Sequence, residues 1–390
     1  ERKSFSYKEA QKEIDFFGGK LNAAYNAVER HAKSWRKNKI ALYWVGAENE
    51  KLKFTFKELN DKTNQFARML GSLGVVKGDR VFFFLTRVPE LYFGFLGALK
   101  TGAIAGTMFA AFGPQAIEDR LENSSAKVLV TELNLFDRVA KAADKLPELK
   151  TILVLGDAEK IAKLELAGLP AGQAGKKVIS LTELLEKQSK EYKTHMMHPN
   201  DPAFMLYTSG TTGKPKGVVH THKSIIHQHM SAKYALDLKD EDVYWCTADP
   251  GWVTGVAYEI LGSWSNGVSE VITNRRFDPA DWYQTIQDYQ VTVWYTAPTA
   301  IRMLQAAGDE LVKKYDLSSL RYLASVGEPL NPEPIRWGLK VFGLPFHDNW
   351  WQTETGGILI ANYASMDIKP GSMGKPLPGI VAAIISDEGK

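Results

Sequence analysis

Two periods alternate in the arrangement of apolar and polar residues along this chain. Short apolar runs, such as those at 81–85 and 203–207, have the length and composition of buried strands. Between such runs the apolar positions recur with a helical period, and in 57–73 they gather on one side of the helix. Further strands are expected at 54–56, 104–108, 127–130, 151–155, 243–247, 291–295 and 322–326. The alternation of strands and helices predicts an α/β fold with largely parallel sheets.

Changes in this pattern divide the chain into four parts. Residues 1–45 are polar with scattered aromatic side chains, and we expect a helical N-terminal extension there. The most polar and charged stretch, 159–200, lies at the boundary of two α/β subdomains, expected at 46–195 and 196–365. From residue 366 onward, Gly and Pro separate short apolar segments, which indicates the start of a small, truncated β-barrel at 366–390.

Composition and charge exclude several classes of function. A formal net charge of +3 on 390 residues is too small to indicate a nucleic-acid or membrane partner. The most apolar region, 81–112, is interrupted by Arg87, Glu90 and Lys100, so it is not expected to cross a membrane. The single cysteine, Cys246, lies in an expected strand, where a buried thiol in a reducing cytoplasm is the simplest interpretation.

The segment that follows the strand at 203–207 has the composition of a phosphate-binding loop. Glycines let backbone N–H groups turn toward an anion, hydroxyls add donors, and lysine adds positive charge. The loop contains Thr208, Ser209, Gly210, Thr211, Thr212, Gly213 and Lys214. It is not the loop of a P-loop kinase, because Pro215 follows Lys214 where that motif needs serine or threonine.

Three more segments lie where expected strands end, which is the edge of an open α/β sheet at which ligands bind. At 327–329 the sequence is Gly-Glu-Pro, and the glycine allows a flat ligand to lie against the backbone. At 348–355 two adjacent tryptophans precede the carboxylate of Glu354. At 249–255 Gly and Pro flank an aromatic residue. Taken alone, the segments at 327–329 and 249–255 are equally compatible with ordinary turns.

Together these segments resemble the signatures of the AMP-forming acyl- and aryl-CoA synthetase superfamily, and the acetate–CoA ligases within it are the most similar. The resemblance covers almost the whole chain. It implies the large N-terminal domain of that superfamily, with two stacked α/β subdomains in a layered αβαβα arrangement. It also implies ATP, Mg²⁺, coenzyme A and acetate. Acetate would react through an enzyme-bound acetyl-adenylate to give acetyl-CoA, AMP and diphosphate.

The resemblance assigns roles to individual residues. Lys214 and the hydroxyls of its loop would hold the β- and γ-phosphates, Thr353 would lie near the α-phosphate, and Glu354 would hold Mg²⁺. These three are the expected catalytic residues. The other residues assigned to ATP are Gly327, Glu328, Pro329, Asp348, Asn349, Trp350, Trp351 and Gln352. The superfamily commonly has threonine at the position of Asn349.

The resemblance also implies an acyl pocket and a coenzyme A site. The pocket would be small, with the Trp351 indole closing its far end and excluding longer acids sterically. Its expected walls are Trp252, Val253, Thr254, Val326 and Trp351. Thr254 and Arg138 are the expected contacts of coenzyme A, with Arg138 at its 3′-phosphate.

Alternatives to this interpretation stay open at the level of sequence. The acid could be propionate or another short acid, and the chain could be a non-catalytic nucleotide-binding module. The histidines between 220 and 229 are expected to pack at the start of a helix rather than to bind a metal. The chain begins without methionine and ends in a turn-like sequence, so we expect a piece of a longer protein. The superfamily's C-terminal domain supplies an essential lysine, and residues 1–390 alone are expected to be inactive. The oligomeric state is not predicted.

Overall fold

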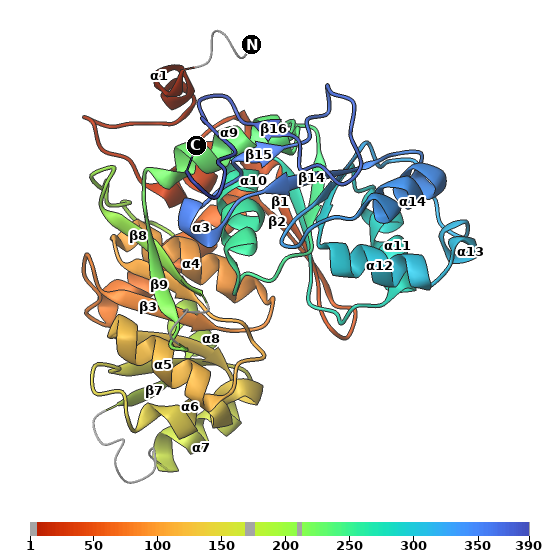
Figure 1. Ribbon diagram of the computed structural model, residues 1–390. Helices are drawn as coiled ribbons and strands as arrows, with labels where there is room; N and C mark the ends of the chain where they lie inside the picture. The colour runs from red at the N-terminus through yellow and green to blue at the C-terminus, as the bar shows by residue number, and fades with distance from the viewer. Residues whose placement is uncertain (1–5, 168–175, 209–212, 390) are drawn as a thin grey trace.

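The computed structural model describes residues 6–167, 176–208 and 213–389 and contains two β-sheets (Figure 1). The first sheet has the strand order β7-β6-β5-β3-β4-β8-β9. All of its neighbouring strands are parallel except β8 and β9, which form an antiparallel pair. Its strands are β3 (Arg80–Phe84), β4 (Ile104–Thr107), β5 (Val128–Glu132), β6 (Thr151–Leu155), β7 (Lys177–Ser180), β8 (Pro202–Thr208) and β9 (Lys216–Thr221).

The second sheet has the order β16-β15-β14-β13-β12-β10-β11-β1-β2. Its central strands are parallel, whereas β2, β15 and β16 at its two ends pair antiparallel. Its strands are β1 (Ile40–Val45), β2 (Lys51–Thr55), β10 (Val243–Cys246), β11 (Ser269–Thr273), β12 (Val293–Thr296), β13 (Tyr322–Ser325), β14 (Phe346–Trp350), β15 (Ile360–Ala361) and β16 (Lys375–Pro376). The expected α/β fold with largely parallel sheets is therefore confirmed.

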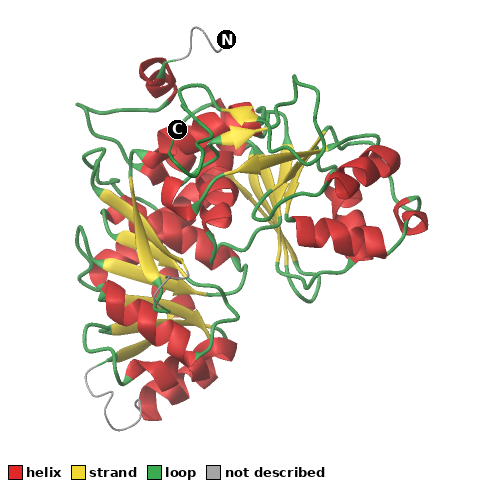
Figure 2. Ribbon diagram, in the orientation of Figure 1, coloured by secondary structure: helices red, strands yellow, loops and turns green. Residues whose placement is uncertain are grey.

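Helices cover both faces of each sheet (Figure 2). The α-helices are α1 (Tyr7–Ala10), α2 (Arg30–Ala32), α3 (Phe56–Ser72), α4 (Pro89–Thr101), α5 (Pro114–Ser124), α6 (Phe136–Ala143), α7 (Ala158–Ala167), α8 (Leu181–Glu186), α9 (Ser224–Ala235), α10 (Gly262–Ser265), α11 (Pro279–Tyr289), α12 (Pro298–Ala306), α13 (Asp309–Val312) and α14 (Pro332–Phe342). Short 3₁₀ or π segments are η1 (Gln11–Glu13), η2 (Tyr25–Glu29), η3 (Trp35–Asn38), η4 (Leu133–Leu135), η5 (Gly255–Leu261) and η6 (Thr353–Thr355).

The apolar residues explain the order of the layers. Successive residues of a strand face opposite sides of its sheet, so Phe83 of β3 joins the core between the two sheets while Phe82 faces α5 and α6. The core between the sheets also takes in residues of α3, α4, α9 and α10. On the far side of the second sheet, Trp245 and Trp294 pack against α11, α12 and α14. The result is the expected layered αβαβα arrangement.

Local signals account for some differences from the predicted elements. The strand expected at 54–56 is instead β2, which ends at Thr55, because Thr55 caps α3. Its hydroxyl accepts the Glu58 N–H at 3.2 Å, and Glu58 Oε2 accepts the Thr55 N–H at 2.8 Å. Residues 40–45, expected within the helical extension, form β1 because their apolar side chains complete the second sheet beside β11.

Sheet membership does not follow the expected subdomain limits at residues 46 and 196. Strand β2 lies in the second sheet, although it precedes every strand of the first sheet. Strands β8 and β9 follow residue 196 but lie in the first sheet. The chain thus crosses between the sheets more than once. The division into subdomains, including a β-barrel that begins at residue 366, stays a prediction.

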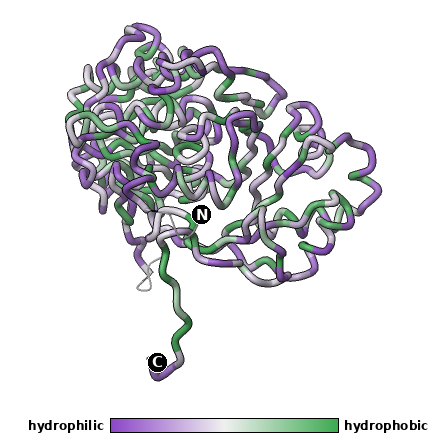
Figure 3. The backbone as a smooth tube through the Cα atoms, turned by 90° about the horizontal axis from the view of Figure 1, so that it is seen from above, coloured by the Kyte–Doolittle hydropathy of each residue, from purple (hydrophilic) through white to green (hydrophobic). Residues whose placement is uncertain are grey.

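The C-terminal segment differs from the rest of the chain in its exposure. It leads away from the body of the protein, and its apolar residues are not covered (Figure 3). Val381 and Ile384 are fully exposed. Within the described ranges 6–167, 176–208 and 213–389, no helix has both the length and the apolar character needed to cross a membrane.

Candidate active site

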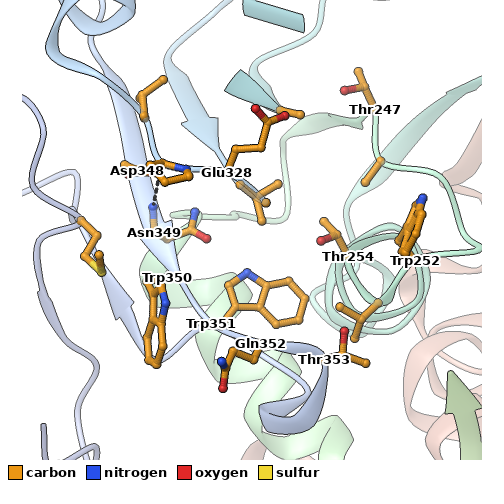
Figure 4. Close-up of a pocket in the computed structure, with 18 of the residues that line it drawn as sticks. Thr247, Trp252, Thr254, Glu328, Asp348, Asn349, Trp350, Trp351, Gln352 and Thr353 are labelled. Carbon is orange, nitrogen blue, oxygen red and sulfur yellow. Dashed lines mark hydrogen bonds between the residues drawn. The ribbon is translucent and has the colours of Figure 1, made fainter. Parts of the chain in front are cut away.

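A cavity of about 1200 Å³ lies at the carboxyl ends of strands from both sheets. Thr247 follows β10 and Val326 follows β13, at one edge of the second sheet, and Thr208 ends β8 of the first sheet. Figure 4 shows side chains from several such segments pointing into one space. The predicted residues that line it are Thr208, Trp252, Val253, Thr254, Val326, Gly327, Glu328, Pro329, Asp348, Asn349, Trp350, Trp351, Gln352, Thr353 and Glu354.

The wall at 327–329 is open enough for a flat ligand. Gly327 has φ of +96°, a conformation that favours glycine, and a Cβ added there would meet no atom within 4 Å. Glu328 Oε2 accepts hydrogen bonds from the Thr299 hydroxyl at 2.8 Å and from Arg302 at 2.6 Å. Partial burial opposes ionisation, but these hydrogen bonds hold the pKa of Glu328 below its usual value. Glu328 is therefore an oriented carboxylate at the rim.

Strand β14 supplies two buried polar side chains. Asp348 accepts the Asn349 N–H at 3.0 Å, and burial raises the pKa of its carboxyl to about 6. Asn349 is fixed on both sides: its Oδ1 accepts from the Tyr295 hydroxyl at 2.9 Å, and its Nδ2 donates to the Ser325 carbonyl at 2.8 Å. Asn349 therefore presents a fixed edge to the cavity while its amide links three neighbouring strands.

The two tryptophans after these residues differ in their surroundings. Trp350 is 40% exposed. The Trp351 indole is half-buried and lies edge-on to Tyr258, with ring centroids 5.2 Å apart. Figure 4 shows this indole extending toward the side of the cavity where Thr254 lies. Trp351 thus lies at the boundary between the cavity and the buried core.

The loop at 249–254 connects the cavity to the first sheet. Thr107 of β4 donates to the Pro250 carbonyl at 2.6 Å, and Asp249 accepts the Gly251 N–H at 2.7 Å. Thr254 is buried, whereas Trp252 is 48% exposed and packs against Phe109 and Phe112. Trp252 therefore borders the cavity on the side of the first sheet, away from Trp351.

The predicted phosphate loop is described only at its two ends. Thr208 closes β8 and lines the cavity, and Gly213 has φ of +84° before the return strand β9. Lys214 is exposed and is not among the residues that line the cavity. Ser209, Gly210, Thr211 and Thr212 lie outside the described residues. The antiparallel pairing of β8 with β9 makes this loop the connection of a hairpin.

Arg138, the expected contact of coenzyme A, does not line the cavity. It is half-buried on α6, and its Nη1 donates to the Ala110 carbonyl at 2.8 Å. This contact fastens the loop after β4. A role for Arg138 at a 3′-phosphate stays a prediction.

The histidines between 220 and 229 contact different partners. His220 stacks on Phe204 and its ring faces the Thr353 carbonyl, while His222 Nδ1 accepts the Ala23 N–H at 3.1 Å. His229 lies between Glu13 and Ser265. Burial lowers the pKa of His220, and it lowers the pKa of His222 to about 4. In the part of the chain that is described, no group of three or more His, Cys, Asp or Glu side chains is placed to hold a metal ion.

Sequence reasoning missed several residues at this site. Thr299 and Arg302 orient Glu328, yet they lie 29 and 26 residues earlier in the chain. Tyr258 contacts Trp351 from a buried position in η5, and Tyr295 holds Asn349. The only sequence signal for Tyr258 was its place four residues after Thr254, which is one helical turn.

Comparison with known proteins identifies the family of this chain. The model of the family described as AMP-binding enzyme matches residues 28–390. The chain belongs to this family of AMP-binding enzymes. The match includes every segment that lines the cavity.

Curated relatives in the AMP-binding family are similar over nearly all of this chain. The acetyl-coenzyme A synthetase of Bacillus subtilis (strain 168) is 52% identical over 372 residues, which cover 95% of this chain and 62% of that protein. The acetyl-coenzyme A synthetase of Methanothrix thermoacetophila is 42% identical over 382 residues, covering 96% of this chain and 58% of that protein. The chain thus spans about three fifths of the length of these relatives.

A solved structure shares the fold of this chain. The crystal structure of an acyl-CoA synthetase from Brucella canis superimposes with a TM-score of 0.89 at 31% sequence identity. The superposition covers 100% of this chain and 68% of that one. The arrangement of the two sheets is therefore shared with that acyl-CoA synthetase.

Proposed function

We propose that the protein containing this chain is an AMP-forming acetate–CoA ligase, which converts ATP, acetate and coenzyme A to acetyl-CoA, AMP and diphosphate. The observation that carries the proposal is that one cavity collects a nucleotide wall and a small apolar end. The wall comprises 327–329 and 348–350, and the apolar end comprises Val253, Val326 and Trp351. The identity to acetyl-coenzyme A synthetases supports the choice of acetate.

The nucleotide would lie along the wall. Gly327 leaves room for a flat base, and Asp348 and Asn349 offer polar atoms beside it. Glu328, oriented by Thr299 and Arg302, is placed to meet the nucleotide at the rim. The phosphates would then extend toward Thr208 and Thr353, and Lys214 and the hydroxyls of its loop are proposed to hold them.

Mg²⁺ fits this arrangement. The exposed carboxylate of Glu354 lines the cavity, and Mg²⁺ commonly takes one or two carboxylates together with water and substrate phosphates. When bound, the ion would neutralise charge on the phosphates. Glu354 would hold it, and η6 fixes the backbone of Glu354 between Thr353 and Thr355.

The residues of the chain would mainly position reactants. Acetate is ionised at neutral pH, so its oxygen needs no general base to attack the α-phosphorus, and diphosphate leaves. Trp351, Val253 and Val326 would exclude water and larger groups from the methyl end. The thiol of coenzyme A would then take the acetyl group from the adenylate and release AMP, with Thr254 as the proposed contact beside the pocket. The buried thiol of Cys246 suits a cytoplasmic location.

Carboxylate-dependent exchange of diphosphate into ATP tests the proposal. Acids from acetate to octanoate are compared on this chain and on the product of the full gene. Exchange that is highest with acetate in the full product supports the ligase. Exchange that is highest with propionate would make propionate the substrate and leave the proposed reaction class unchanged. If neither protein exchanges diphosphate yet both bind ATP, the chain is a nucleotide-binding module.

A further inference from the structure

We propose that Tyr258 determines acyl-chain specificity by fixing the position of Trp351. This inference rests on the proposed function and deepens it, since Tyr258 itself does not line the cavity. The Tyr258 ring stands edge-on to the Trp351 indole, with centroids 5.2 Å apart and planes at 85°. Edge-to-face pairs of this kind prefer one relative orientation. The position of the indole therefore depends on where Tyr258 is held.

The hydroxyl of Tyr258 is held by a directed chain of hydrogen bonds. It accepts the Ile358 N–H at 2.6 Å and lies 2.6 Å from the Ser231 hydroxyl. Ser231 has one proton, which it donates to the His227 carbonyl at 2.6 Å. Ser231 therefore accepts from Tyr258, and both hydrogen-bonding roles of the Tyr258 hydroxyl are filled. Because the side chain is fully buried, water cannot replace these partners.

The same contacts join the two sides of the acyl pocket. Tyr258 belongs to η5, a π-helical segment that begins directly after Thr254. Val253, Thr254 and Trp351 all line the cavity, and Ile358 follows η6, the turn that comes after Trp351. One side chain thus links the wall, the indole and the turn behind it. The distance between the wall at 253–254 and the Trp351 indole sets the depth of the acyl pocket. Tyr258 fixes that distance through its contacts on the side of the indole away from the cavity.

A second ring supports the same position. Tyr295 of β12 lies edge-on to Tyr258, with centroids 6.0 Å apart, and its hydroxyl binds Asn349. The Tyr258 ring is therefore packed between Tyr295 and Trp351. Deleting only its hydroxyl leaves this packing in place but frees the ring to shift. Deleting the ring leaves a space that the indole can enter.

The test uses two variants of Tyr258 and a matched control. Tyr258→Phe removes the hydroxyl and keeps the ring, and Tyr258→Leu removes the ring. The control, Tyr322→Phe, removes another buried hydroxyl, one that donates to the Ala235 and Asn362 carbonyls and has no ring contact with Trp351. Binding of acetyl- and propionyl-sulfamoyl adenosine, which are stable mimics of the adenylates, is measured by calorimetry. Diphosphate exchange with acetate and propionate is measured on the full-gene product.

The expected result is a change in preference. In Tyr258→Phe the ratio of propionyl to acetyl binding rises about threefold to tenfold, and in Tyr258→Leu it rises further, because one methylene is worth about 10- to 200-fold in a rigid pocket. In Tyr322→Phe the ratio of propionyl to acetyl binding stays that of the unmodified protein. The inference is overturned if both Tyr258 variants keep that ratio, or if the control shifts it equally. If the unmodified protein binds neither mimic and exchanges no diphosphate, the proposed function itself fails.

Discussion

The hydroxyl of Tyr295 on β12 donates a 2.9 Å hydrogen bond to Oδ1 of Asn349 on β14, across the intervening strand β13. The other end of the Asn349 amide donates to the Ser325 carbonyl of β13. Asn349 thereby joins three strands at the edge where the cavity opens. Its side chain is 8% exposed, so each partner depends on this amide for its hydrogen bond.

Replacing Asn349 by Ala should therefore weaken both the sheet edge and the nucleotide wall. Two buried groups lose their partner, and the free energy of unfolding should fall by about 2 kcal/mol or more. ATP affinity should fall with it, because Asn349 lines the cavity. Urea unfolding and calorimetric titration with ATP measure the two effects. Asn134→Ala, at an exposed position, is the control, and equal stability of the two variants would contradict the assigned role.

The carboxyl of Asp348 should make stability depend on pH. Burial raises its pKa from 3.8 to about 6, so the folded protein holds a proton that the unfolded chain releases. Stability should therefore fall as pH rises from about 4 to 6, and then level off. The full difference corresponds to about 3 kcal/mol.

Asp348→Asn removes this ionisation and keeps an oxygen that can accept the Asn349 N–H. Urea titration compares the unfolding free energy of this variant with that of the unmodified protein. The two values should be equal near pH 4, and the variant should be more stable at pH 8. A gain that is the same at both pH values would show that Asp348 is not the titrating group.

A buried ion pair joins η2 of the N-terminal segment to α4. Lys100, which is fully buried on α4, lies 3.3 Å from Glu29 and donates to Asn60 and Asn64 at 2.7 and 2.6 Å. Burial lowers the pKa of Lys100 to about 8, although Glu29 opposes this. Lys100→Met should cost about 2 kcal/mol or more of unfolding free energy, because Asn60 and Asn64 lose their buried donor and the Glu29 carboxylate keeps only the exposed Lys33, at 2.7 Å, as its cation.

The double variant Lys100→Met/Glu29→Gln separates charge from packing. It removes both charges, and the amide oxygen that replaces the Glu29 carboxylate can still accept from the Thr194 hydroxyl. Part of the lost stability should return in a urea titration, because the buried carboxylate is gone while Asn60 and Asn64 still lack the Lys100 donor. If the double variant is less stable than Lys100→Met alone, the loss does not arise from an unpaired charge.

The sequence predicted most of the central strands, but it missed β11, where Ser269, Glu270 and Thr273 interrupt the apolar run, and it missed the edge strands β7 and β9. Central parallel strands are buried on both faces and appear as apolar runs, so 151–155 was predicted to the residue. Strand β9 lies at a sheet edge with Lys216, Gly217 and Val219 exposed, and therefore has no apolar run. Its pairing with β8 depends on the hairpin, which hydrophobic periodicity does not encode.

The residues of the candidate site divide in a similar way, into those that the sequence predicts and those that it does not. Most residues predicted from short motifs at strand ends line one cavity, because parallel strands bring such ends to one edge of a sheet. Tyr258 and Arg302 act through contacts with residues far away in the sequence, at Trp351 and Glu328. Nothing local distinguishes Tyr258 from an ordinary core tyrosine. The raised pKa of Asp348 likewise depends on burial that only the folded chain creates.

Trp351 offers the most direct test of acid preference. Its indole lines the cavity between the nucleotide wall and Val253, and glycine at this position would extend the apolar end into the space that the indole fills. In Trp351→Gly the ratio of kcat/KM for butyrate to that for acetate should rise about tenfold or more, because a longer chain gains contacts while acetate loses its close fit. Diphosphate exchange on the full-gene product measures this ratio.

Trp350→Gly is the matched control for this experiment. Trp350 is the neighbouring indole on the same strand end, 40% exposed, and Figure 4 shows it on the other side of the backbone from Thr254. Its removal should lower ATP affinity without changing the order of acids, because it contacts the nucleotide wall and not the apolar end. Unchanged acetate selectivity in Trp351→Gly, or the same shift in both variants, would refute the assignment of Trp351 to the acyl pocket.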